Sequence, residues 1–301
     1  MISKKRKGDK NKPSFAYRLS DSLDLVHGAP VLDYTPMPTL KLTVEYKGTR
    51  YLGWQEQAQG RTIQGELRKA AEEYFHEEVD IGGSGRTDAG VHALAQIAHL
   101  RTLKKFPPDQ ICDGLNLKLP PDIHVLKVEP SSERFHARHS AIARYYLYQI
   151  STRRTAFAKD YVWWVKGQID VKKIENALSL FCGRHDFRAF TERANEQGST
   201  IVELTEARIV VAQDLLLIRL GASHYLWRMV RRIVGVVVRI GLGELEPEIV
   251  HQFLGKTNGS TGQWTAPASG LFLERVLYAG DAPPSTMAPV IPVFTASNSN
   301  S

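Results

Sequence analysis

The sequence predicts an α+β fold in which two halves share one extended antiparallel or mixed sheet, with helices packed behind it. Several short segments alternate apolar and polar residues with a period of two, which is typical of half-buried strands. Segments with helical spacing follow them, and this order of strands and helices occurs twice along the chain. The 301 residues are 43% hydrophobic and 24% charged, a composition and length sufficient for a sizeable core.

The first half is predicted to begin with a strand at residues 40–44, where leucine and valine alternate with lysine and threonine. Thr62 is a predicted N-cap for an amphipathic helix over residues 63–75. A glycine-rich turn at residues 82–85 follows this helix. Three further strands are predicted at residues 93–100, 123–129 and 143–150.

The second half is predicted to contain a helix, two strands, a second helix and a closing strand. These elements are residues 171–182, 202–211, 215–222, 225–241 and 270–278. In the second helix the apolar residues form one stripe, and Arg228, Arg232 and Arg239 are predicted on the opposite face. Arg231 falls at the edge of the stripe, where a partly desolvated guanidinium needs a carboxylate or backbone oxygens as partner. The alternative is an ordinary arginine that extends its charge into water.

The two ends of the chain differ in composition from the middle. Residues 1–13 hold six lysines and arginines and few apolar residues, so they cannot bury enough surface to offset their ordering entropy. We therefore predict a basic flexible extension and a flexible C-terminal tail, which is rich in proline and ends in serine and asparagine. The predicted units are the extension (1–38), the N-terminal half (39–145), the C-terminal half (146–279) and the tail (280–301).

The composition restricts the class of protein and its partners. Lysine and arginine exceed aspartate and glutamate by 39 to 32, a net charge of +7 that favours nucleic acid, although a solvated basic surface is the alternative. The longest apolar run, residues 233–238, is far shorter than the roughly 20 residues of a membrane-spanning helix, so no membrane association is expected. Two cysteines are too few for a thiolate zinc site or a disulfide framework. We expect a reducing compartment, the cytoplasm, or the nucleus or an organelle in a eukaryote.

Glycines and side chains that can take part in chemistry are most concentrated in the run Gly-Arg-Thr-Asp-Ala-Gly-Val-His at 85–92. Two glycines bracket Asp88, so its carboxylate can lie on a sharply bent backbone facing a cleft and act as a nucleophile. One alternative is an aspartate that caps its own turn. Another is a phosphate-binding loop, although the Gly-Lys-Ser/Thr ending of a P-loop is absent.

A second group lies on the strand predicted at 143–150. Tyr146 is an aromatic residue of this strand, and Arg138 and Arg144 flank it. An unstacked base needs a flat ring to lie against and cations for its phosphates, and this pattern offers both. The alternative is that the tyrosines pack in the core of the sheet.

The run at residues 85–93 resembles the signature loop of the tRNA pseudouridine synthase A family, also called tRNA pseudouridine synthase I. The resemblance extends from about residue 40 to residue 278, and the other motifs agree with the family in order and spacing. They are YLGWQ (51–55), FHAR (135–138), RYYLY (144–148), DF (186–187), MVRRIVG (229–235) and APASGL (266–271). The chain departs from the family at His139, where an aromatic residue is common, and at Tyr145, where arginine or lysine is common.

The resemblance implies the pseudouridine synthase fold, with two RNA-recognition-like (ferredoxin-like) halves and a cleft between them. It implies an isomerase that converts uridine to pseudouridine at positions 38, 39 and 40 in the anticodon arm of tRNA, without a metal, nucleotide or redox cofactor. It further implies a homodimer whose basic groove holds tRNA across both subunits.

Motif by motif, the resemblance also implies roles for individual residues. Asp88 corresponds to the nucleophile, Arg231 to the cation that pairs with it, and Tyr146 to the aromatic residue against the target base. Further substrate contacts are expected from Arg86, Arg144 and His92. Whether Asp88 attacks C6 of the base or the sugar stays open.

Two other classes of protein are compatible with parts of the pattern. A non-catalytic RNA-binding protein or RNA chaperone explains the charge and the aromatic strand, but it has no need of the complete loop at 85–92. A carboxylate-dependent hydrolase requires a second acid near Asp88 or a cluster of metal ligands, and no such spacing occurs in the sequence.

Overall fold

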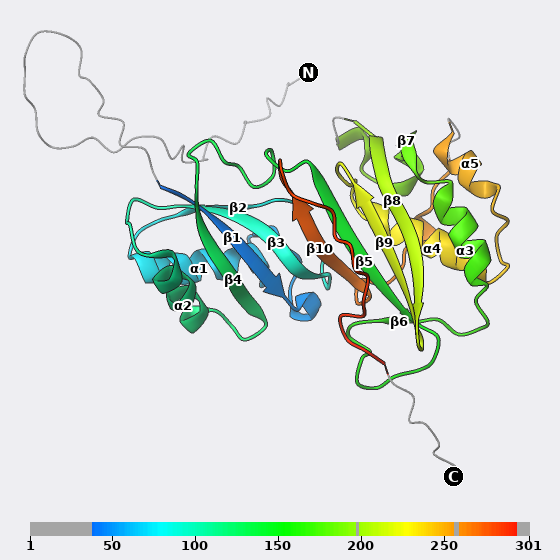
Figure 1. Ribbon diagram of the computed structural model, residues 1–301, viewed down its shortest axis with the longest axis horizontal. Coiled ribbons are helices and arrows are strands. Elements are labelled where there is room, and N and C mark those ends of the chain that lie inside the picture. Colours follow the sequence, from blue (N-terminus) through cyan, green and yellow to red (C-terminus); the bar gives the residue numbers. More distant parts are fainter. Residues whose placement is uncertain (1–37, 197–198, 256–258, 294–301) are drawn as a thin grey trace, which may run out of the picture.

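The α+β prediction is confirmed by the computed structural model, which describes residues 38–196, 199–255 and 259–293 and contains a ten-stranded mixed sheet (Figure 1). The predicted basic extension, apart from Pro38, lies outside the described residues. Among the helices of the described ranges, none has the length and hydrophobicity needed to cross a bilayer.

The strands of the N-terminal half are β1 (Thr39–Tyr46), β2 (Asp80–Gly83), β3 (His92–Arg101) and β4 (Ile123–Ser131). Those that follow are β5 (Ala143–Ser151), β6 (Trp163–Trp164), β7 (Gly183–Asp186), β8 (Ile201–Ala212), β9 (Leu215–Ala222) and β10 (Leu271–Leu277). The α-helices are α1 (Ile63–Phe75), α2 (Pro108–Lys118), α3 (Val171–Ser179), α4 (Met229–Gly241) and α5 (Ile249–Leu254). Short 3₁₀ turns are η1 (Gly48–Arg50), η2 (Arg188–Phe190), η3 (Ala194–Glu196) and η4 (Gly262–Trp264).

The last strand of the chain joins the two halves. The order along the sheet is β4-β1-β3-β10-β5-β9-β8-β7, with β2 paired to β3 and β6 to β5. β10 runs parallel to β3 and antiparallel to β5. Figure 1 shows α1 and α2 beside the N-terminal strands, and α3, α4 and α5 beside the C-terminal ones. The unit boundary predicted between residues 145 and 146 falls inside β5.

One hydrophobic core runs beneath the helices of both halves. It takes alternate residues of the strands, such as Leu42, Val44 and Tyr148, and the apolar stripe of each helix. The predicted start of α1 is confirmed, because the Thr62 hydroxyl accepts a hydrogen bond from the backbone N–H of Gly65 at 3.2 Å.

Three local predictions are wrong. The helix predicted from residue 225 begins at Met229, because Arg228 adopts a left-handed conformation with φ of 60°. Arg232, predicted on the polar face of this helix, is fully buried and pairs with Glu192. The predicted turn at 82–85 begins with two residues of β2, and at Gly83 an added Cβ would lie 2.4 Å from the indole ring of Trp54.

The prediction of a flexible C-terminal tail is wrong for residues 281–293, which lie against the face of the sheet opposite the helices. Val293 is buried there with Leu147, Leu217 and Phe272. Arg219 of β9 fastens the segment, because its guanidinium donates to the carbonyls of Pro284 and Thr286. Apolar side chains hold this proline-rich stretch on the sheet, although it has no regular secondary structure.

We expect Arg219→Met to lower the free energy of unfolding by about 3–5 kcal/mol, because it leaves the half-buried carboxylate of Glu274 without its cation. The two side chains form a fork, with Arg219 Nε 2.7 Å from Glu274 Oε2. Urea unfolding measures the loss. Arg208→Met is the matched control, since Arg208 lies directly opposite Arg219 in the register of β8 and β9 but has an exposed side chain. Equal losses in the two variants would contradict the role of the buried fork.

Candidate active site

A cavity of about 440 Å³ opens where the two halves meet. The loop at residues 84–91, the start of β5 and the start of α4 supply most of its wall. Its lining contains six arginines. Asp88 supplies the one carboxylate among the described residues that line it. The arginines are Arg86, Arg138, Arg144, Arg193, Arg228 and Arg231. Such a concentration of guanidinium groups suits a polyanionic ligand.

The loop that carries Asp88 is tied to the strands beneath it. The hydroxyls of Tyr46 and Thr87 are 2.9 Å apart, and Gln96 Nε2 donates to the carbonyl of Gly85 at 3.0 Å. Burial raises the pKa of Tyr46 to about 12, so this hydroxyl stays protonated. Gly53 has φ of 98°, and an added Cβ would lie 2.3 Å from the Thr87 carbonyl, so only glycine permits this approach. The backbone on either side of Asp88 is therefore held in place.

Arg231 meets this carboxylate from the other half of the protein. Its Nη1 lies 3.2 Å from Asp88 Oδ2, although 143 residues separate the two in sequence. Its Nε donates to the carbonyl of Ala266 at 2.7 Å, and the Ala266 N–H donates back to the Arg231 carbonyl. Gly235 lets this segment approach α4, because an added Cβ would lie 1.5 Å from the Trp264 carbonyl oxygen. The guanidinium is thus aimed by backbone on one edge and presents its other edge to Asp88.

Tyr146 of β5 also lines the cavity and is only 8% exposed. Its ring stands edge-on to Tyr225, with centroids 5.0 Å apart. Burial, with smaller effects from Tyr46 and the Asp88 charge, raises the pKa of Tyr146, so its hydroxyl stays protonated. The ring packs in the core, as one interpretation expects, and it also borders the cavity, where the other interpretation places a base.

Arg144 and Arg86 lie at the cavity in different ways. Arg144 is buried, and its guanidinium donates to four backbone carbonyls, so it joins the walls of the cavity to one another. The acceptors are Ser84, Arg138, Ala141 and Ser223, at 2.8–3.2 Å. Arg86 is exposed, and its Nε donates to Gln55 Oε1 at 3.0 Å.

His92, predicted as a substrate contact, is not among the residues that line the cavity. It is 1% exposed, stacks on Phe272 and accepts a hydrogen bond from the Gly48 N–H at Nδ1. Its Nε2 therefore carries the proton and donates to the Asp160 carbonyl at 2.9 Å. Burial lowers the pKa of His92, which agrees with a neutral core histidine. The prediction failed because His92 is the first residue of β3 and no longer part of the loop.

Arg193, Trp227 and Arg228 are among the lining residues that sequence reasoning does not single out as site residues. Arg193 lies between η2 and η3, outside any motif of regular spacing. The sequence predicts Trp227 and Arg228 inside a helix, whereas the left-handed conformation of Arg228 leaves both residues before its start.

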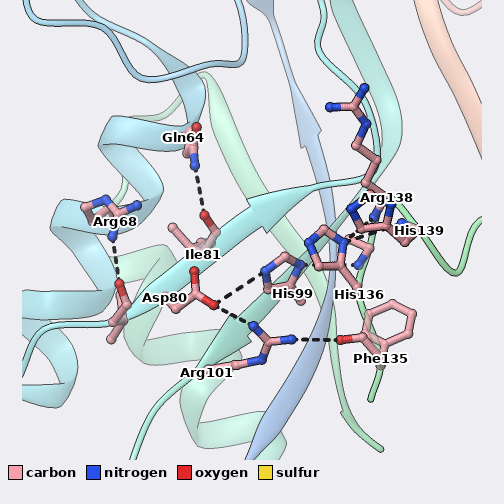
Figure 2. A network of polar contacts seen from close by, with 12 residues as sticks. Gln64, Arg68, Asp80, Ile81, His99, Arg101, Phe135, His136, Arg138 and His139 are labelled. Atoms are coloured by element: carbon pink, nitrogen blue, oxygen red, sulfur yellow. Dashed lines mark hydrogen bonds and ion pairs between the residues drawn. The ribbon is translucent and has the colours of Figure 1, made fainter. Parts of the chain in front are cut away.

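A network of polar contacts holds the loop that carries Arg138, as Figure 2 shows. Arg101 of β3 donates to Asp80 Oδ2 at 2.7 Å and to the Phe135 carbonyl at 3.3 Å. The backbone N–H of Arg138 donates to His136 Nδ1 at 3.2 Å. Residues of β2 and β3 thus position one wall of the cavity.

His99 lies at the centre of the same network (Figure 2). Its Nδ1 accepts a hydrogen bond from the Ala137 N–H at 3.2 Å, and its Nε2 is 3.8 Å from Asp80 Oδ2. Burial is the main reason that the pKa of His99 is lowered to about 4. The neutral ring is therefore the native form at neutral pH.

This histidine is expected to make the protein less stable in mild acid. Below a pH of about 6.5, His99 binds a proton in the unfolded chain but stays neutral in the native protein. The stability contributed by the neutral ring is therefore fully present above this pH and is lost as the pH falls toward 4. Urea unfolding between pH 7.5 and 4.5 measures the slope, which is up to about 1.4 kcal/mol per pH unit for one proton. His99→Gln should flatten it, whereas the exposed control His251→Gln should not. An unchanged slope in His99→Gln would refute the assignment.

No group of three or more histidine, cysteine, aspartate or glutamate side chains with a metal-binding arrangement occurs among residues 38–196, 199–255 and 259–293. The side chains that line the cavity include one carboxylate, six guanidinium groups, the imidazole of His224 and the aromatic rings of Tyr146, Tyr225 and Trp227. These groups can hold a planar base and its phosphates and can supply a nucleophile.

Comparison with known proteins identifies relatives over most of the chain. The model of the tRNA pseudouridine synthase family matches residues 42–140 and 177–279. The tRNA pseudouridine synthase A of Aquifex aeolicus is 43% identical over 244 residues, which cover 80% of this chain and 100% of the relative. That of Thermodesulfovibrio yellowstonii is 35% identical over 254 residues, with coverage of 80% and 100%.

Among solved structures, a chain of the archaeal box H/ACA sRNP Nop10-Cbf5 complex superimposes with a TM-score of 0.31 and 11% identity. The superposition covers 67% of this chain and 42% of the other. This likeness is too distant to add to the sequence matches.

Proposed function

The chain belongs to the tRNA pseudouridine synthase family, and we propose that it isomerises uridines 38, 39 and 40 in the anticodon arm with Asp88 as the nucleophile. Members of the family are isomerases that form pseudouridine in tRNA, and this chain is one of them. The observation that carries the finer proposal is the carboxylate of Asp88 beside Arg231, in a cavity lined by arginines.

The reaction requires a group like Asp88. The N1–C1′ bond of the uridine breaks, the uracil turns, a C5–C1′ bond forms, C5 loses its proton and N1 gains one. A carboxylate supports this exchange either by attack on C6 of the base or by attack on C1′ of the sugar. Arg231 acts as counter-ion and orients the carboxylate, because its other edge is fixed on the Ala266 carbonyl.

The target base must leave its stack to reach the cavity. Tyr146 supplies a ring against which the flipped uracil lies, and the exposed Arg86 is placed to occupy the vacated space in the arm. Arg144 acts through the wall of the cavity, because its donors are directed to backbone carbonyls. We assign His92 to the core and give it no contact with the substrate.

Release of tritium from tRNA labelled at C5 of uridine tests the activity directly. The protein should release tritium from an anticodon arm with uridine at position 38, 39 or 40, and none when all three are cytidine. Release that is unaffected by the cytidine replacements would refute the assigned positions. Binding without any release would instead support the non-catalytic RNA-binding class, and liberation of free uracil or strand cleavage would support a hydrolase.

We further propose a homodimer, since closed two-fold association is the commonest arrangement of soluble oligomers and the resemblance implies it. Light scattering after size-exclusion chromatography tests this, and a mass near the 33.8 kDa of one chain would refute it. The cytoplasm remains the proposed location on the strength of the low cysteine content.

A further inference from the structure

Three side chains form a stack at the cavity. The stack has no part in the proposed chemistry, and its residues lie outside the sequence motifs named above. The guanidinium carbons of Arg193 and Arg228 lie 4.5 Å and 4.1 Å from the centre of the Trp227 ring. All three residues line the cavity that contains Asp88. We name this group the Trp227 stack.

The backbone of Arg228, a member of the stack, has an unfavourable conformation just before α4. Its φ of 60° is in the left-handed region, which is strained for a residue other than glycine. Its Nε is buried without a hydrogen-bond partner among the described residues. Backbone strain and an unsatisfied buried donor both occur preferentially at functional sites, and here they fall on one residue of the cavity lining.

An ion pair next to Arg193 in sequence connects its segment to α4. Arg232 of α4 is fully buried, and its Nη2 pairs with the carboxylate of Glu192. The Arg193 N–H also donates to Thr191 Oγ1 at 3.2 Å. The segment that carries Arg193 is therefore fastened to the same helix that begins after Arg228.

The geometry of stacking leaves these cations suited to phosphate. A guanidinium that lies over a ring uses its face for the cation–π contact, and its N–H groups point outward in its own plane. These in-plane donors match two oxygens of a phosphodiester. The indole also limits the rotation of both side chains, so less conformational entropy is lost on binding.

We propose that Arg193 and Arg228, held on Trp227, bind the phosphates on either side of the uridine that enters the cavity. The inference rests on the proposed function, because it takes the ligand to be a flipped nucleotide of RNA. When the base lies beside Asp88 and Tyr146, its flanking phosphates must remain at the opening of the cavity. The stack thus supplies a phosphate site on the C-terminal half.

Binding of an anticodon-arm RNA at several salt concentrations tests the stack. Arg228→Gln should weaken binding about tenfold and reduce the slope of log affinity against log salt by about 0.7–0.9, the release expected for one phosphate. Arg193→Gln should behave in the same way. Trp227→Leu should weaken binding without any change in charge. Arg208→Gln, an exposed arginine of β8 absent from the lining, is the matched control and should leave both quantities unchanged.

Neutral methylphosphonates placed singly on either side of the target uridine identify the contact. At the contacted phosphate, the substitution should weaken binding to the parent protein about tenfold and should add little in Arg228→Gln or Arg193→Gln. If the loss of affinity from the methylphosphonate and the loss from the Gln substitution multiply at both phosphates and in both variants, the proposal is overturned. Gln variants that bind as the parent does would also overturn it. Tritium release by the parent protein is measured separately, so failure of the proposed function is distinguishable from failure of the phosphate site.

Discussion

Asp88→Asn is expected to abolish pseudouridine formation while tRNA binding persists. The amide keeps the size of the side chain and can still accept a hydrogen bond from Arg231, but it has no charge with which to attack the base or the sugar. Loss of a nucleophile typically lowers turnover by about 10⁴-fold or more. Tritium release under single-turnover conditions measures the chemistry, and filter binding measures the affinity.

The matched control for this variant is Asp113→Asn, which removes the same charge from an exposed position of α2. Its turnover and affinity should equal those of the parent protein. Turnover by Asp88→Asn within tenfold of the parent would contradict the nucleophile assignment. A loss of tRNA binding by this variant would show instead that the carboxylate serves the fold of the loop.

Arg231→Met is expected to lower turnover by about 10²–10³-fold, the usual cost of removing one charged donor from a reacting centre. It removes the counter-ion of Asp88 and the donor to the Ala266 carbonyl together. Arg231→Lys should restore only part of the activity. A single ammonium cannot replace a planar fork whose Nε and Nη1 serve two acceptors in two different segments.

Arg239→Met is the control on the same helix, because Arg239 is half-buried, is absent from the cavity lining and pairs locally with Glu244. It should leave turnover unchanged. If Arg231→Met turned over at the rate of the parent, Arg231 would be an ordinary arginine at the edge of its helix. Measurement of tRNA affinity separates a loss of the chemical step from a loss of binding, since a variant that has lost only the chemical step binds tRNA as the parent protein does.

Most of the strands and helices could be predicted because their cause is local. The alternation in residues 40–44 and the N-cap at Thr62 are properties of short segments, and the structure has both elements. The failures have non-local causes. Gly82 and Gly83 read as a turn, but they form a strand because their missing side chains admit His99 and Trp54.

Burial of charge was the second source of error. Arg232 and Arg219 are both fully buried, each beside a carboxylate supplied by a distant segment, and nothing near them in sequence predicts it. The proline-rich residues 281–293 have no periodic pattern either. They are ordered by the apolar face of the sheet on which they lie, and that face exists only after strands from both halves have paired.

The loop that presents Asp88 and the helix that carries Arg231 are recognisable in the sequence alone because each is a contiguous motif, and the order of the motifs indicates the family. The contact between these two side chains, which the resemblance implies, depends on the tertiary structure, since β10 must lie between β3 and β5 before residues 143 positions apart come within 3.2 Å. The structure also places His92 in the core, outside the cavity lining, and Trp227 in the lining. Side-chain direction at the end of a motif depends on where the strand or helix begins, and long-range packing sets that position.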